Sequence, residues 1–591
     1  MTVRQVSIVD RDFLSSEKAF RKKSCAAKII QSIYDVFCKI NYFLKRFFIE
    51  HFASRESSIE KLINRLAENR IAAMQDCSKK FSIELLQDKS DLKDSSEEQI
   101  QVFIDKVIFL KNLIEKKDIK IVSEHSNDIR KEIDEILEDE VYKKNKNSNC
   151  PAVNFLQELC NCIFLKSKGS DEISEYAQTI ISIDKPICSF KDLGSNLDAA
   201  YKKEKKEPNR DRLSSTLKWV IASPIKSLNV LLTRILPLET NQYQINNNEI
   251  AVQDYVFNKS GTRFYHGPNP ATGNLFSGYL DYLKKHHFVH LHHNLQHLSK
   301  SGEEYRIYEL LRKEESYKGT LRLFTTPMDG KAWKCSDDRF LEFKDPNEFY
   351  LNYAKFAIAN DLSSSAATIE NISGNAFRYH EVDKNQDNGF YIGQDVMSDL
   401  QFKQAFILSQ KAMQEISEQS SRWQELHSNK EGRKRLSKMM QITAQGFLSI
   451  GALLKLQHDL KDTVSIDQMI NSSFSQSCKQ DIDRGIALNV ITSLFYHLLS
   501  DDVLTKKDIE LIIGTVIGRA MLVEGRTIIF DRFEPLSDLI NFIGDSQKEI
   551  KQALLEYSRQ IQQDKSKEKS FFQRYFVEPF SSATYSRRYV K

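Results

Sequence analysis

A cysteine and an arginine frame a short loop towards the C-terminal end of the sequence. Cys478 ends a polar run, five residues follow, and Arg484 stands at the start of an apolar helical pattern. A loop that leads into a helix N-terminus gathers unpaired backbone N–H groups and the positive end of the helix dipole, so it suits a phosphate group. The same field lowers the pKa of a cysteine from about 8.5, which favours the thiolate. The two side chains can therefore supply a nucleophile and a bidentate phosphate clamp.

The element that must position this loop is the helix after it. Apolar residues recur there at the spacing of one buried helix face. The residues expected on that face are Ile486, Val490, Ile491, Leu494, Phe495 and Leu498.

The stretch from Cys478 to Arg484 resembles the C-x5-R loop of the cysteine-dependent phosphatases. It is most similar to phosphatases of phosphoinositides and inositol phosphates, namely Sac-domain enzymes, myotubularin-like enzymes and secreted bacterial effectors. Lys479 directly after the cysteine and Asp483 directly before the arginine carry this likeness. The resemblance implies hydrolysis of a phosphomonoester through a cysteinyl-phosphate, with Cys478 as nucleophile and Arg484 as clamp, and with neither a metal ion nor another cofactor.

The resemblance also suggests roles for the neighbouring residues. Asp481 and Asp483 inside the loop are candidates for the acid that protonates the leaving alcohol, and Asp329 in a Pro-x-Asp-Gly turn is a third. Asp483 has an alternative role, in which its carboxylate holds the arginine in place. Lys479 would add positive charge for a second phosphate. The remaining loop positions expected at the substrate are Gln480, Ile482 and Gly485.

Three features of the loop differ from the pattern of protein-tyrosine phosphatases. The loop contains no glycine, Gly485 stands where a Ser or Thr hydroxyl is usual, and Ser477 stands where His is usual. These differences count against a phosphotyrosine substrate more than against a phosphoinositide. They leave open a protein phosphatase, a structural cysteine at a helix start, and a non-catalytic helical scaffold or effector with a degenerate phosphate-binding loop.

Six of the 13 histidines fall between positions 286 and 297, in a segment that is expected to be a strand. On such a strand His290 and His292 share one face, and His287 and His293 share the other. No neighbouring cysteine or carboxylate completes a metal-ligand set, so no metal site is expected. The sequence also lacks Walker-type, dinucleotide-binding and H-E-x-x-H motifs.

The composition is that of a globular protein. Of its 591 residues, 41% are hydrophobic and 28% charged, and the net charge of +4 is too small to indicate a nucleic-acid partner. Nine cysteines without regular spacing indicate reduced thiols. Neither a signal peptide nor a transmembrane helix is expected. The predicted location is the cytoplasm, or a host cell into which a bacterial effector is secreted without a signal peptide, with a host protein as a possible partner.

The predicted fold is α+β or α/β, predominantly helical. A helical N-terminal region (1–210), an amphipathic connecting segment (211–245), a phosphatase-like α/β domain with helical insertions (246–563) and a basic tail (564–591) are expected. Helices are predicted over 58–86, 97–117, 127–143, 151–167, 171–183, 278–285, 345–360, 401–426, 435–461, 508–524, 535–543 and 547–563, and strands over 287–295, 321–327, 375–380 and 389–392.

Two helical segments, 26–52 and 213–238, combine apolar and aromatic residues with scattered lysines. Each can pack into a bundle core or lie in a membrane interface, where the lysines would meet anionic headgroups. Peripheral membrane contact is therefore one expected mode of interaction. The charged stretch over 201–212, which contains a proline, is read as a break between domains.

Overall fold

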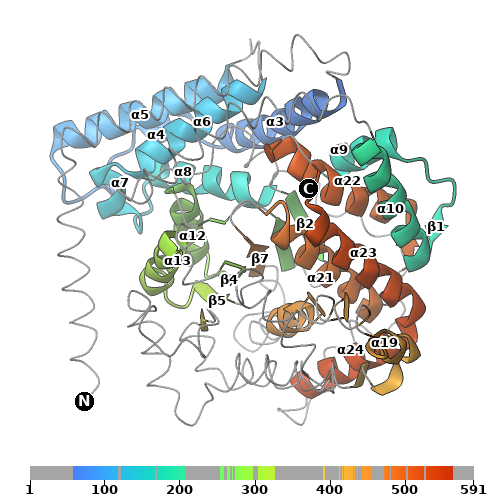
Figure 1. Ribbon diagram of the computed structural model, residues 1–591. Coiled ribbons are helices and arrows are strands. Elements are labelled where there is room, and N and C mark those ends of the chain that lie inside the picture. The colour runs from blue at the N-terminus through green and yellow to red at the C-terminus, as the bar shows by residue number, and fades with distance from the viewer. Residues whose placement is uncertain are drawn as a thin grey trace, which may run out of the picture.

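The computed structural model describes residues 57–116, 122–166, 170–206, 253–257, 262–266, 269–270, 273–296, 304–325, 391–392, parts of 412–454, 472–478, 481–500, 503–524 and 527–562. These residues are mostly helical, as predicted, with a few short strands. Figure 1 shows the strands near the middle of the molecule, with helices on several sides of them.

The regular elements of the described N-terminal part are all helices apart from one two-residue strand. Its elements are α3 (Ser57–Ser78), α4 (Ile83–Leu86), α5 (Glu97–Glu115), α6 (Val122–Leu137), α7 (Glu140–Asn145), α8 (Pro151–Asn161), the π-helical turn η1 (Cys162–Lys166), α9 (Ser170–Ile180), β1 (Ile187–Cys188) and α10 (Phe190–Lys206). Two of the predicted helices are each divided in two. Ser82 caps α4 by accepting from the Leu85 amide, and Asp139 caps α7 by accepting from the Val141 amide.

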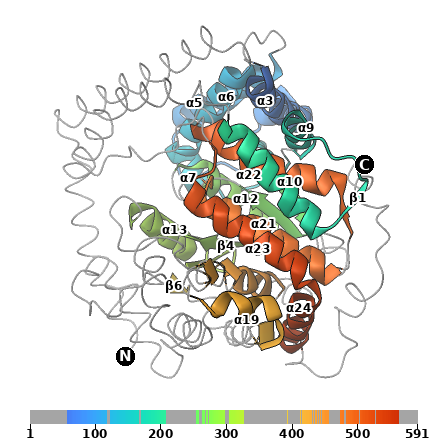
Figure 2. The same cartoon turned by 45° about the vertical axis from the view of Figure 1, so that its right-hand side comes forward.

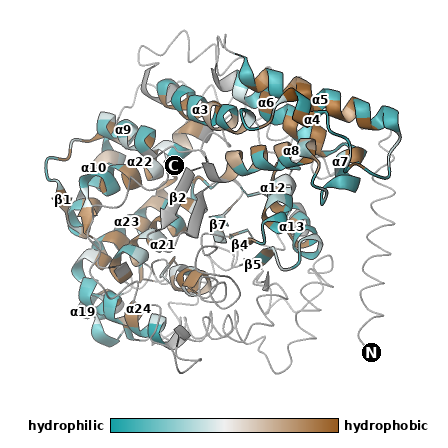
Figure 3. Ribbon diagram, turned by 180° about the vertical axis from the view of Figure 1, so that it is seen from behind, coloured by the Kyte–Doolittle hydropathy of each residue, from teal (hydrophilic) through white to brown (hydrophobic). Residues whose placement is uncertain are grey.

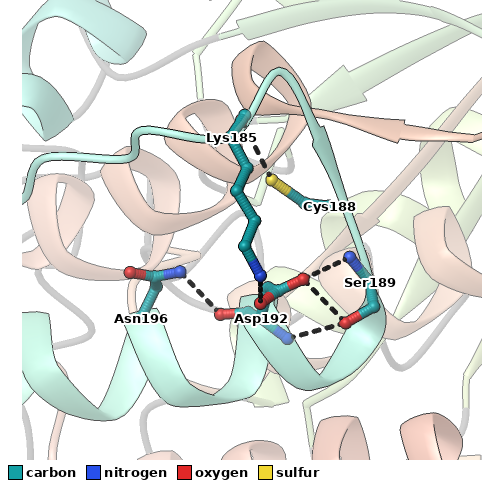
Figure 4. Close-up of polar contacts among 5 residues, drawn as sticks. All are labelled: Lys185, Cys188, Ser189, Asp192 and Asn196. Carbon is teal, nitrogen blue, oxygen red and sulfur yellow. Dashed lines mark hydrogen bonds and ion pairs between the residues drawn. The ribbon is translucent and has the colours of Figure 1, made fainter.

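A short two-stranded sheet lies directly before the two long helices α10 and α22 (Lys506–Glu524). β1 pairs antiparallel with β8 (Leu504–Thr505), which leads directly into α22. A Ser-x-x-Asp sequence at 189–192 and a Thr-x-x-Asp sequence at 505–508 form reciprocal caps, in which each hydroxyl accepts from the aspartate amide and each carboxylate accepts from the backbone of the capping residue. Figure 4 shows the first of these caps. The helix that it starts, α10, continues to Lys206, so the predicted break begins later than residue 201.

Six strands form the second sheet: β2 (Gln253–Phe257), β3 (Thr262–His266), β4 (Val289–Asn294), β5 (Leu321–Thr325), β6 (Tyr391–Ile392) and β7 (Ser472–Ser477). Their order is β2-β3-β7-β4-β5-β6, and β3, β7, β4 and β5 run parallel, whereas the two outer strands are antiparallel. The strands predicted at 287–295 and 321–327 are confirmed as β4 and β5. The central strand β7 was not predicted.

Helices cover both faces of this sheet. α12 (Leu275–Lys285) connects β3 to β4, and α13 (Glu304–Ser316) connects β4 to β5. The hydroxyl of Tyr279 on α12 contacts Ser473 of β7, whereas Gln476, three residues along the same strand, donates to Thr492 of α21 (Arg484–Ser500). Because side chains alternate along a strand, α12 and α21 lie on opposite faces of the sheet. Figure 2 shows α21 and α23 crossing in front of the strands.

Two apolar cores join elements that are far apart in sequence. The first contains residues of α9, α10 and α21–α24, including α23 (Phe530–Asp545) and α24 (Gln547–Gln562), and the second joins α5–α8 to α12. α9 packs against α22, and α10 packs against α23. Figure 3 shows hydrophobic stripes alternating with hydrophilic ones along α3, α5 and α6. Each core therefore includes residues from both sides of position 210.

The predicted membrane-interface segments, 26–52 and 213–238, lie outside the described residues. The same holds for the elements predicted at 345–360 and 375–380, whereas the strand predicted at 389–392 is present as β6. Among the helices that the structure describes, none is both long and apolar enough to cross a bilayer.

Candidate active site at the carboxyl end of the central strand

The predicted loop lies at the carboxyl end of the central strand. β7 ends at Ser477, Cys478 follows it directly, and α21 begins at Arg484. The helices that follow β3 and β7 lie on opposite faces of the sheet. In open parallel sheets, ligands bind outside the carboxyl ends of the strands at such a point of reversal. The sequence-predicted loop and the location favoured by the topology are therefore the same place.

Arg484 is the first residue of α21, and its guanidinium reaches across to the neighbouring strand. Its Nη1 donates to the carbonyl oxygen of Leu295, directly after β4, over 3.4 Å, and the residue is only 8% exposed. The Leu295 amide donates in turn to the carbonyl of Ser477, directly before Cys478. The guanidinium is thus turned inward over the strand ends, on the side of the loop where Cys478 begins.

Cys478 is 4% exposed and has apolar neighbours. It belongs to the first core together with Ile482 of the same loop, which is 2% exposed. The side chain of Ile482 is therefore part of the core, and its contribution to a ligand is limited to its backbone. All six residues predicted on the buried face of α21 are buried, but so are most residues on its other sides, so the helix is buried nearly all round and not on one face alone.

The two loop aspartates have different surroundings. Asp481 is fully buried, and its carboxylate oxygens accept from Asn489 of α21 over 3.2 and 3.3 Å and pair with Arg519 of α22 over 2.9 Å. Asp483 lies just before α21, and its carboxylate accepts from the amide of Ile529 over 3.1 Å. Its carbonyl accepts from the Ala487 amide, as expected for a residue that caps a helix.

Gly485 lies against the Asp481 carboxylate. A Cβ atom at Gly485 would stand 1.6 Å from Asp481 Oδ1, so no side chain fits there in this arrangement. Lys479, Gln480 and Asp329, the other predicted site residues, lie outside the described residues.

A row of buried polar side chains joins β4 to β7. His290 contacts Ser473 through Nδ1 over 2.7 Å and Ser475 through Nε2 over 2.8 Å, and His292 contacts Ser475 through Nδ1 over 2.7 Å. His293 lies on the other face and contacts Ser449. His287 precedes β4 and adopts a φ of +58°, so it does not share a strand face with His293 as predicted.

Burial keeps these histidines neutral at ordinary pH. Desolvation lowers the pKa of His292 and of His293 to about 3, and it lowers that of His290 well below its usual value. No group of three or more potential metal ligands occurs among the residues that the structure describes. The histidines therefore act as neutral hydrogen-bonding groups that hold the central strands in register.

Further buried amides and hydroxyls lie at the carboxyl ends of these strands. Asn269 donates to Asn294 and to Gln296, each over 2.9 Å. Three buried polar atoms on this side have no hydrogen-bond partner within the described part of the chain, namely His292 Nε2, Gln296 Nε2 and Ser477 Oγ. Since an unpaired buried polar atom is costly, these atoms are candidates to bind water or ligand hydroxyl groups.

Comparison with known proteins assigns no family to the chain: no family model, no curated protein and no solved structure matches it. A function for this chain must therefore be inferred from the geometry of this loop and from its C-x5-R pattern.

Two residues at the loop were not predicted from the sequence. Arg519 is fully buried within the apolar helix α22, and Asn489 is fully buried within the apolar helix α21. Arg519 is the one charged residue between Glu510 and Glu524, and Asn489 interrupts a run of apolar residues, so each leaves a detectable signal. A buried arginine or asparagine needs a partner, but only the fold reveals that the partner is Asp481.

Proposed function

We propose that this protein is a cysteine-dependent phosphatase that hydrolyses a phosphomonoester of a phosphoinositide or an inositol phosphate. One observation carries this proposal: Cys478 and Arg484 frame a loop between the central parallel strand and a buried helix, and the guanidinium is turned inward over the strand ends. We further assign residues 246–563 to a phosphatase-like α/β domain, supported by the parallel order of β3, β7, β4 and β5.

The proposed reaction has two steps. The Cys478 thiolate attacks phosphorus, the bond from phosphorus to the alcohol oxygen breaks, and an acid gives the leaving alcohol its proton. Water then attacks the cysteinyl-phosphate, the phosphorus–sulfur bond breaks, and inorganic phosphate and the thiolate are released. Arg484 and the N–H groups at the start of α21 neutralise the phosphoryl oxygens in both steps.

The surroundings of the aspartates bear on which of them is the acid. Both carboxylate oxygens of Asp481 are occupied by Asn489 and Arg519. We therefore assign Asp481 to support of the loop and leave the acid role to Asp483 or Asp329. Asp483 is closer to solvent than Asp481, and a backbone amide holds its carboxylate beside the start of α21.

Two features support a polyol substrate at a lipid surface. His292, Gln296 and Ser477 each have a buried polar atom without a hydrogen-bond partner among the described residues, and these neutral donors and acceptors suit ring hydroxyl groups. Ile529 and Phe530 are 42% and 48% exposed, and the Ile529 amide contacts Asp483. Exposed apolar side chains beside the loop fit peripheral contact with a membrane that carries the substrate. Action as a secreted bacterial effector on a host membrane is part of this proposal.

A second candidate is a phosphate-binding protein without turnover. It is favoured by the 4% exposure of Cys478 and by the Asp481 carboxylate beside Gly485, where a hydroxyl is usual in the phosphatases that the loop resembles. In this alternative, α21 and Arg484 bind a phosphorylated lipid or protein, but the thiol does not react. The site chemistry is otherwise the same.

Phosphate release separates the two candidates. We would measure release from a phosphoinositide panel, from soluble inositol phosphates and from phosphotyrosine peptides. The wild-type chain would be compared with Cys478→Ser and with Cys77→Ser, a matched change at a buried cysteine in α3. Vanadate-sensitive release that is lost only in Cys478→Ser supports the phosphatase. Lipid binding without release in any form supports the binding protein, and release from the peptides alone supports a protein phosphatase.

A further inference from the structure

Asp481 adopts a backbone conformation that glycine would adopt more easily. Its φ is +54°, in the left-handed region that most side chains avoid and that aspartate tolerates better than most. The loop thus makes the turn without an internal glycine. Since glycine would make this turn at lower cost, the side chain at 481 must contribute something that glycine cannot.

The side chain at 481 contributes a carboxylate, which lies where the loop, α21 and α22 meet. Asn489 of α21 donates to both of its oxygens, and Arg519 of α22 pairs with Oδ2 at 2.9 Å. Both members of the ion pair are completely inaccessible to solvent. Among the described residues, Arg519 makes no other ion pair and its guanidinium nitrogens make no hydrogen bond, so Asp481 is the one counter-ion that this part of the chain supplies for its charge.

Gly485 belongs to the same arrangement. Its missing side chain leaves the space that the Asp481 carboxylate occupies, because a Cβ atom there would lie 1.6 Å from Oδ1. The absent loop glycine and the absent hydroxyl after Arg484 therefore have one explanation. The carboxylate of residue 481 fills the place that a side chain at residue 485 would need.

Stability alone is a poor reason for such a pair. Removing two charges from water costs about as much as their attraction returns, and apolar residues of similar volume are often equally stable. What the pair offers instead is a single conformation, since a misplaced loop would leave a buried charge without its partner. It also offsets a negative charge next to a site for an anion.

We propose that Arg519 is a positioning residue for the phosphate site. Through Asp481 it fixes residues 481–484, the described part of the loop that leads into α21, in the conformation that receives a phosphoryl group, and its charge cancels that of the carboxylate beside the bound anion. This inference rests on the proposed function, because it assigns Arg519 a role in binding at the same loop. Arg519 itself need not contact the substrate.

The test measures the affinity of the full chain for orthovanadate, together with its melting temperature. The variants are Arg519→Met, Arg519→Lys, Asp481→Asn and the double variant Asp481→Asn/Arg519→Met. Arg70→Met is the matched control, since Arg70 is also buried but lies on α3. We expect Arg519→Met to weaken vanadate binding by at least about tenfold, as expected for a misplaced phosphate loop. Arg519→Lys should recover part of this loss, because it restores the charge.

The double variant makes the test specific. Removing both charges should bring the affinity closer to wild type than Arg519→Met alone, since no carboxylate is then left unpaired beside the anion. Arg70→Met should lower the melting temperature without changing the affinity. If wild type binds vanadate and Arg519→Met affects binding no more than Arg70→Met, the inference is overturned and the proposed function stands. If wild type does not bind vanadate, the proposed function fails and the inference fails with it.

Discussion

The buried histidines of β4 make stability sensitive to mild acid. Burial holds the pKa of His292 and of His293 at about 3, and that of His290 well below its usual value. In the unfolded chain a histidine titrates near pH 6.5. As the pH falls below 6.5, the unfolded chain therefore binds protons that the folded chain does not bind. The stabilising effect of the neutral histidines is complete above that pH and decreases below it.

The size of the loss follows from these pKa values. At pH 5.5, one unit below 6.5, a histidine that stays neutral in the folded protein lowers the unfolding free energy by about 1.4 kcal/mol, because only the unfolded chain binds its proton. His292 and His293, each with a pKa of about 3, together predict a loss of about 2.7 kcal/mol between pH 7.5 and pH 5.5, and the lowered pKa of His290 adds to this loss.

Urea unfolding at the two pH values measures this loss. His292→Asn keeps a polar atom near the position of Nδ1, which contacts Ser475, but removes the titrating ring. We expect its pH-dependent loss to be smaller than that of wild type by about 1.4 kcal/mol. His287→Asn is the control, because His287 is exposed and its φ of +58° suits asparagine. Equal losses in wild type and in both variants would refute the assignment of His292 as a buried neutral group.

The remaining predictions concern the loop and the surface beside it. Gly485→Ser should disrupt the loop, because a Cβ atom there would lie 1.6 Å from Asp481 Oδ1. The Asp481 carboxylate would have to move by about 1.8 Å to reach an ordinary contact distance of 3.4 Å, and it would then leave Arg519. We expect the unfolding free energy in urea to fall by about 3 kcal/mol, and a stability equal to wild type would contradict this reasoning. Adding Asp481→Gly and Arg519→Met to Gly485→Ser should recover most of the loss. Replacing Ile529 and Phe530 together by serine should weaken binding to phosphoinositide vesicles in a sedimentation assay and leave hydrolysis of a soluble inositol phosphate unchanged, whereas an equal effect on both would argue against membrane contact.

The sequence is most informative where periodicity is strong. The apolar face of α21 and the start of that helix at Arg484 follow directly from the pattern of its residues, and most of the other described helices were predicted within a few residues of their ends. Strands β4 and β5 were also predicted, since apolar Val289 and Leu291 alternate with histidines in β4 and β5 is rich in apolar residues. In these elements local pattern and tertiary burial agree.

The central strand could not be predicted in the same way. β7 consists of serines, one phenylalanine and one glutamine, a composition that is typical of a loop, and all six residues are buried. Its polar side chains find partners in the histidines of β4, which lie almost 200 residues earlier. The role of Asp481 was hidden for the same reason, because Arg519 reaches it from α22. Long-range polar pairing leaves little trace in a single sequence.

The most direct test of the central claim is to trap the phosphorylated enzyme. The chain would be mixed with a phosphoinositide that carries radioactive phosphorus in its ring phosphates, quenched in alkaline detergent, and digested at alkaline pH so that the labelled peptide can be identified. Cys478 should carry the label, which should be absent in Cys478→Ser and strongly reduced in Arg484→Met. Phosphate release that persists in Cys478→Ser, or a label on any other residue, would contradict the proposed mechanism.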